Sequence, residues 1–193
     1  MGPGEMALVP IGGKLSENPV KSRADHLSRR FGSYWKMERA CAFIFPPLAF
    51  AWAKPESLIA ASVLALALVA SCSLLWVGAA YWRAIWARFE LGQTSIDATL
   101  SMAQRWKPFC CVATILSLAV STANIVWAGP GVASFVAMGF SVLAVLEYVN
   151  YYHVQLQNFD HGPTFRRFLT RGTFPRAHLA KDLESFRDRK ANP

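Results

Sequence analysis

Charged residues are scarce in the middle of this sequence. They make up 17% of its 193 residues, against about 25% in an ordinary soluble domain, while hydrophobic residues make up 53%. The charges gather in residues 1–39, in one central loop and near the C-terminal end, which leaves long apolar runs between them. This distribution argues against a soluble fold and predicts a helical integral membrane protein.

The sequence also lacks the patterns of catalytic and cofactor sites. Its four cysteines form no C-x-x-C pair, which argues against a disulfide framework or a zinc site, and no nucleotide-binding or hydrolase motif occurs. The four histidines are expected on the cytoplasmic side or at the membrane interface, whereas a membrane haem would need its ligands within the apolar core. We therefore expect no catalytic residue, no metal and no cofactor.

Four apolar stretches predict an all-α, four-helix up-down transmembrane bundle over residues 37–156. They cover residues 37–53, 57–82, 108–128 and 132–156. The second has 26 residues without a charge, whereas the first has only 17 and contains Pro46 and Pro47. Prolines inside a helix remove donors and clash with the preceding turn, so we expect a kink there. A re-entrant or interfacial first segment remains an alternative.

Polar segments flank and divide this bundle. Residues 1–36 are predicted to be a disordered basic N-terminus, with a short helix over residues 22–30 as an alternative. Residues 94–107 are predicted to be a polar loop in which Ser95 caps a short helix to Trp106. Residues 157–193 are predicted to form basic amphipathic helices. The residues expected to contact lipid or a partner there are Phe165, Arg166, Arg167, Phe168 and Arg171. Farther along, Leu179, Leu183 and Phe186 repeat at helical spacing and would dock on a partner or on the chain itself.

The basic residues predict an orientation. Lys54 is the only lysine or arginine beside the two short turns, and the other 19 lie in the N-terminal region, the central loop and the tail. Cytoplasmic segments carry the excess of lysine and arginine, so we expect both termini in the cytoplasm and the chain in a plasma membrane of the bacterial inner-membrane type.

Glu147 is the ionisable residue that we place inside a predicted crossing, and such a residue suggests a functional site. On one helix Glu147, Asn150 and Tyr151 share a face, and His153 lies nearby on another side. We expect Glu147 to pair with a base such as Arg83, Arg39 or Lys36. These positions are candidates for an ion pair or a ligand site: Glu147, Asn150, Tyr151, His153 and Arg83.

Three functions remain open at this point. The favoured one is a non-catalytic accessory or scaffold subunit that docks a partner or anionic lipid through its cytoplasmic side. The alternatives are a small-molecule or ion transporter that uses Glu147, and a membrane enzyme acting on lipid. The expected partners are the bilayer, anionic lipids above all, and a protein partner or a second copy. Nucleic acid is not expected, because no nucleic-acid-binding motif accompanies the basic residues.

Overall fold

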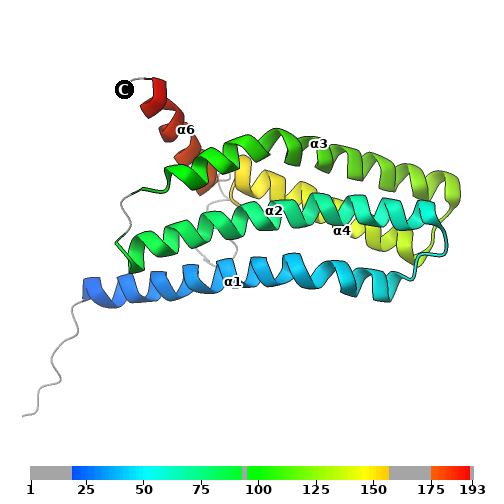
Figure 1. Ribbon diagram of the computed structural model, residues 1–193, viewed down its shortest axis with the longest axis horizontal. Helices are drawn as coiled ribbons and strands as arrows, with labels where there is room; N and C mark the ends of the chain where they lie inside the picture. Colours follow the sequence, from blue (N-terminus) through cyan, green and yellow to red (C-terminus); the bar gives the residue numbers. More distant parts are fainter. Residues whose placement is uncertain (1–18, 93–94, 157–174, 192–193) are drawn as a thin grey trace, which may run out of the picture.

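The computed structural model describes residues 19–92, 95–156 and 175–191. Within these residues the chain forms five helices and no strand, with one isolated antiparallel bridge between Val154 and Arg176. Four long helices lie side by side and a shorter one crosses one end of them (Figure 1). The helices are α1 (Pro19–Ala53), α2 (Leu58–Glu90), α3 (Asp97–Ala128), α4 (Val132–Tyr152) and α6 (His178–Ala191). The predicted all-helical class is confirmed.

The two short turns lie at the end of the bundle opposite α6, which we call the hairpin end. Ser57 caps α2 there by accepting a hydrogen bond from the Ala60 N–H at 3.1 Å. Between α3 and α4, Gly129 takes a φ of +88°, a conformation that glycine adopts without steric cost. The other end, where α6 packs against α3 and α4, is the α6 end. Of the four long helices, α2 has the most extensive contacts with the other three, so it is the central helix of the bundle.

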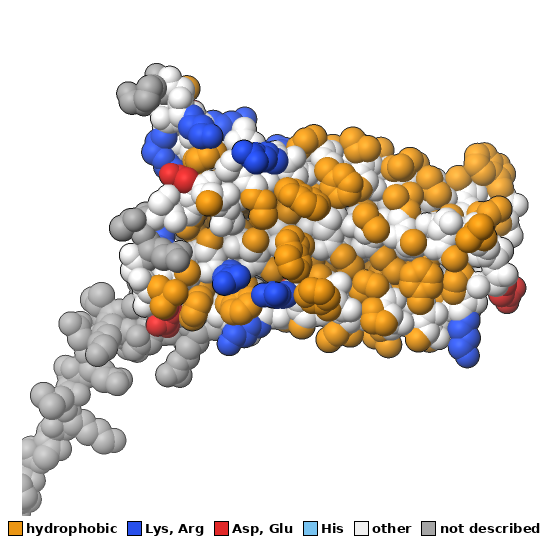
Figure 2. All heavy atoms as spheres, viewed as in Figure 1, with side chains coloured by type: hydrophobic (Ala, Val, Ile, Leu, Met, Phe, Trp, Pro, Cys, Tyr) orange, Lys and Arg blue, Asp and Glu red, His pale blue; other side chains and the backbone are white. Residues whose placement is uncertain are grey.

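Three helices, α2, α3 and α4, are long and apolar enough to cross a membrane. Large apolar side chains on their outer faces are exposed, as on Ile115, which is 64% exposed. Figure 2 shows hydrophobic side chains over the middle of the bundle and lysine and arginine gathered toward the α6 end. A polypeptide with this apolar girdle needs lipid around it, so the membrane assignment is supported. The apolar part of α1, residues 37–53, contains Glu38 and Arg39 near its start. Helix α1 is not among the three helices that are long and apolar enough to cross a membrane.

Two helices extend beyond the starts of the predicted crossings. Helix α1 begins at Pro19, so disorder is wrong for residues 19–36, while residues 1–18 lie outside the described residues. Helix α3 is continuous from Asp97 through Pro108, so the short helix expected up to Trp106 is present but joins the third crossing without a break, and its N-cap is Ile96 instead of Ser95. In both places tertiary packing supports the added turns, because Phe31 stacks on Trp82 and Leu100 is buried in the core.

The ends of α2 and α4 differ from the predicted ends of their crossings. Helix α2 ends at Glu90, eight residues beyond the predicted end of the second crossing at residue 82. Helix α1 continues through Pro46 and Pro47. Helix α4 ends at Tyr152, four residues before the predicted end at 156, because the chain turns there to meet the segment before α6. In that meeting the Gln155 N–H donates to the Pro175 carbonyl, and the Ala177 N–H donates to the His153 carbonyl.

The core has two parts. At the hairpin end, small and branched side chains of α1, α2 and α4 pack together. At the α6 end, larger side chains of α2, α3 and α4 pack with three residues of α6: Leu179, Leu183 and Phe186. The apolar face of α6 is therefore buried against this chain's own helices. Of the two expectations for these residues, docking on a partner or on the chain itself, the structure shows the second.

Candidate functional site

A carboxyl group is buried between the helices near the α6 end. Glu38 of α1 is 4% exposed, and its Oε1 accepts a hydrogen bond of 2.6 Å from the hydroxyl of Tyr151 on α4. Tyr151 is itself 3% exposed. The two residues are 113 positions apart in sequence, so their bond joins the first and last helices of the bundle.

Gly78 provides the space in which this bond forms. It lies on α2, between the helices that carry Glu38 and Tyr151, and a Cβ atom added to it would overlap the Tyr151 hydroxyl and ring. The same atom would lie 2.5 Å from Glu38 Oε2. A glycine has no side chain to obstruct this approach, so α1, α2 and α4 meet at one point through Glu38, Gly78 and Tyr151. We call these three residues the polar junction.

The Glu38 carboxyl lacks a basic partner among the described residues. The ion pairs described there join Arg176 to Glu184 and Arg189 to Asp97. The nearest bases along α1 turn to aromatic rings instead, with Lys36 Nζ 5.7 Å from the centroid of Trp35 and Arg39 Cζ 5.6 Å from that of Trp76. An unpaired buried carboxylate is costly, so we expect Glu38 to hold a proton and to be neutral.

The predicted face of Glu147, Asn150 and Tyr151 is only partly assembled as expected. Asn150 Nδ2 lies 3.5 Å from Glu147 Oε2, at the limit of a hydrogen bond, and Asn150 Oδ1 accepts from the Leu156 N–H at 2.9 Å. Tyr151 bonds to Glu38 rather than to Glu147. Asn150 therefore closes the end of α4, while Tyr151 belongs to the polar junction.

The expected ion pair of Glu147 is not among those that the described residues form. Arg83, one of its proposed partners, is exposed and lines a shallow surface pocket with Trp35, Arg39 and Trp76. His153 is also exposed and lies against the ring of Tyr148, with the two ring centroids 5.5 Å apart. The structure thus brings Glu147 and Asn150 together, and the hydrogen bonds and ion pairs described for the chain do not join Arg83 or His153 to them.

The other candidates lie in the C-terminal segment. Residues 157–174 fall outside the described residues, and so do the five residues predicted to contact lipid or a partner: Phe165, Arg166, Arg167, Phe168 and Arg171.

Sequence reasoning missed Glu38 and Gly78. Glu38 stands between Lys36 and Arg39, so it resembles part of a charged flank instead of a buried group. One signal was available, since Glu38 lies inside the predicted first crossing, where any acid is costly. Gly78 carried no comparable signal, because its role depends on side chains from two distant helices.

The described pocket that borders Tyr151 of the polar junction is very small. A crevice of about 10 Å³ borders Tyr151, lined by Tyr81, Trp82, Asn150, Gln155, His178 and Leu179. That volume holds about one water molecule. The junction therefore contains packed polar groups, and a substrate would need the helices to separate. No family model matches the chain, and no significant match was found among curated proteins or solved structures.

Proposed function

We propose that this chain is a membrane scaffold. It would be a non-catalytic accessory subunit whose helical bundle is anchored in the bilayer and whose α6 end docks anionic lipid or a protein partner. The observation that carries the proposal is the closed polar junction. A transport site needs a polar group reachable by its substrate, whereas Glu38 is 4% exposed and bonded to Tyr151. Buried polar groups that bond to each other fix how helices pack.

Four crossings fit this proposal best. Helix α1 lies along α2 and adds exposed apolar side chains to the girdle, including Phe43 at 61% and Leu48 at 60%. Its apolar part of 17 residues is about 25 Å long at helical rise, near the shorter limit for a crossing. Both described ends of the chain would then lie on the side of α6.

The charges support placing the α6 end in the cytoplasm. Lys54 is the one basic residue at the hairpin end of the described residues, whereas Arg88, Arg105 and Lys190 are among many exposed at the α6 end. The positive-inside rule assigns the richer side to the cytoplasm, and anionic headgroups of the inner leaflet would attract it. This orientation presents α6 to cytoplasmic partners.

Transport through Glu147 is the alternative to test, because Glu147 is only partly buried and its hydrogen bond to Asn150 is long. The protein would be reconstituted in liposomes that enclose a pH-sensitive dye, and a proton gradient would be imposed across the membrane. A scaffold should dissipate the gradient at the rate of protein-free liposomes. Flux above that rate, abolished by Glu147→Gln in a protein that remains folded, would refute the scaffold.

The docking function needs a separate test. Native mass spectrometry of the full chain in a mild neutral detergent would compare added phosphatidylglycerol with added phosphatidylcholine. Scaffolding on anionic lipid predicts preferential retention of phosphatidylglycerol, with a preference that weakens as salt is raised. Equal retention of both lipids would remove the lipid part of the proposal.

A further inference from the structure

A notch lined by basic side chains lies where α6 meets α3. Its volume is about 180 Å³, and its lining comes from α3, from the end of α4, from α6 and from Arg176 in the segment before α6. The residues are Gln104, Lys107, Tyr152, Arg176, Ala180, Leu183 and Arg187. Three of the seven are cations and none is an acid, so the lining has a strongly positive charge.

We propose that this notch binds the phosphate group of an anionic phospholipid from the leaflet at the α6 end. The inference deepens the proposed lipid docking and rests on it. Arginine presents a planar fork of donors that matches phosphate oxygens, and lysine adds a point charge. Arg176, Arg187 and Lys107 together offer both kinds of donor from three separate segments.

The cations of the notch are only partly compensated within the protein. Arg176 donates to Glu184 in a pair whose side chains are about half exposed. Lys107 Nζ lies 5.4 Å from the centroid of the Tyr152 ring, a contact that leaves its donors available. Arg187 is exposed, and the ion pairs of the described residues include neither Arg187 nor Lys107. An anion would therefore complete the charge balance of the notch.

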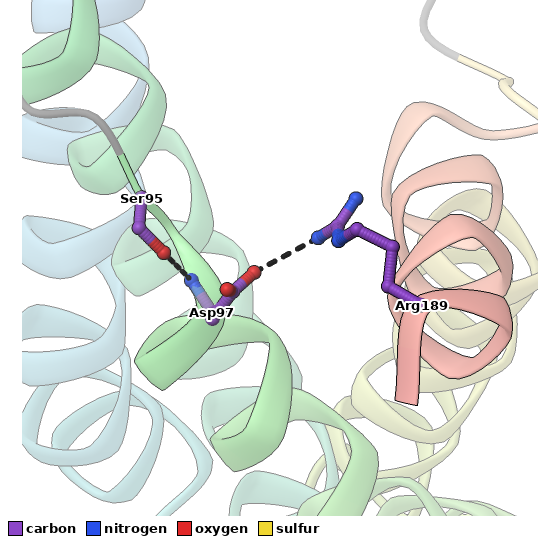
Figure 3. Close-up of polar contacts among 3 residues, drawn as sticks. All are labelled: Ser95, Asp97 and Arg189. Atoms are coloured by element: carbon purple, nitrogen blue, oxygen red, sulfur yellow. Dashed lines mark hydrogen bonds and ion pairs between the residues drawn. The ribbon is translucent and has the colours of Figure 1, made fainter. Parts of the chain in front are cut away.

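Polar contacts between the helices fix the walls of the notch. Tyr81 of α2 donates to Asp182 of α6 at 2.7 Å, and Arg189 of α6 pairs with Asp97 of α3 at 2.9 Å. Figure 3 shows the second contact together with Ser95, whose hydroxyl accepts from the Asp97 N–H. The Tyr152 hydroxyl donates to the Ala103 carbonyl, which fixes the ring that forms one wall. The basic groups are thus presented by packed helices.

The depth of the notch matches a lipid phosphate. Lys107 is the last charged residue of α3 before an apolar run of 21 residues, 108–128. Trp106 beside it is 41% exposed, and tryptophan favours the boundary between headgroups and acyl chains. Farther along α3, Val112 at 63% and Ile115 at 64% exposure offer an apolar surface for an acyl chain. A phosphate in the notch would therefore connect to chains that lie along α3.

The test compares two double variants of the full chain in neutral detergent. Lys107→Gln with Arg187→Gln removes two cations of the notch, and Arg88→Gln with Lys181→Gln removes two exposed cations outside its lining. Both change the formal charge equally. Native mass spectrometry would titrate short-chain phosphatidylglycerol, short-chain phosphatidylcholine and inorganic phosphate. Circular dichroism and thermal unfolding would confirm that both variants keep the fold, and each single notch variant should show a smaller loss.

We expect the notch variant to bind phosphatidylglycerol about tenfold more weakly, equivalent to the loss of one charge-assisted hydrogen bond, and the control to bind within about twofold of the original chain. Equal losses in both variants would overturn the notch and leave lipid docking elsewhere intact. Inorganic phosphate bound as tightly as the lipid would overturn the lipid as its source. An original chain without any preference for phosphatidylglycerol would refute both this inference and the lipid part of the proposed function.

Discussion

Replacing Gly78 with alanine tests the polar junction most directly. The added Cβ would overlap the Tyr151 hydroxyl and ring and crowd Glu38 Oε2, so one of the three helices must move. Gly139 on α4 is the matched control, because a Cβ added there meets nothing within 4 Å. Both changes are from glycine to alanine inside a helix, and only the first disturbs a buried contact.

The size of the effect follows from three terms. Alanine favours a helix interior by about 1 kcal/mol over glycine. Overpacking a core costs about 1–3 kcal/mol. Separating Tyr151 from Glu38 leaves buried polar groups without partners, at about 1–3 kcal/mol. The sum predicts that Gly78→Ala destabilises the bundle by about 3 kcal/mol, while Gly139→Ala leaves it unchanged or raises its stability by up to about 1 kcal/mol.

The assay is equilibrium unfolding in mixed micelles, in which rising SDS unfolds the bundle and the free energy of unfolding is obtained for each variant. A double-mutant cycle adds specificity: Tyr151→Leu removes the ring that the new Cβ meets, so Gly78→Ala should cost less in that background. If Gly78→Ala proves as stable as Gly139→Ala, the three side chains do not meet as described, and the scaffold proposal loses its main support.

Three further predictions concern the docking of α6. Tyr81→Phe removes the donor to Asp182 and should destabilise the docked helix by about 1 kcal/mol, seen as faster proteolysis of the C-terminal segment; an unchanged rate would contradict the contact. The exposed pair of Arg189 and Asp97 should contribute less than about 1 kcal/mol in a double-mutant cycle of unfolding. Partial burial and nearby Lys181, opposed by Asp182, lower the pKa of His178 below its usual 6.5. The folded state then binds fewer protons than the unfolded state, so docking should weaken as pH falls below about 6.5, and His178→Gln should flatten that dependence in a fluorescence-transfer measurement between α6 and α3.

Local hydropathy was sufficient to predict α2, α3 and α4, because a run of about 20 apolar residues satisfies the length and composition of a crossing without reference to other segments. The short turns after Ala53 and after Ala128 likewise lie in the gaps left between the predicted crossings. The start of α1 and the continuity of α3 through Pro108 could not be predicted in this way. The burial of Leu100 was not visible either, since it lies between polar residues in sequence and belongs to a core cluster that includes three residues of α6.

The candidate site was harder to predict because its parts are distant in sequence. The expectation for Glu147 assumed that neighbours on one helix form a site, and Asn150 does lie beside it. Tyr151 instead bonds to Glu38, 113 positions away, and no single-segment pattern encodes that partner. Glu38 could have been singled out by its place in the first predicted crossing, although its charged neighbours made it look like a flank.

The position of the polar junction also bears on function. Tyr151 lies 19 residues beyond Val132 at the hairpin end, about 28 Å along the helix, so the junction is near the boundary of a hydrocarbon core about 30 Å thick. A carboxyl group that couples ion movement would be expected near the middle of that core, accessible in turn from each side. At the boundary, and enclosed by Gly78 and Tyr151, Glu38 instead joins the helices directly beneath α6. The junction thus fixes α1, α2 and α4 relative to one another at the end of the bundle where α6 docks.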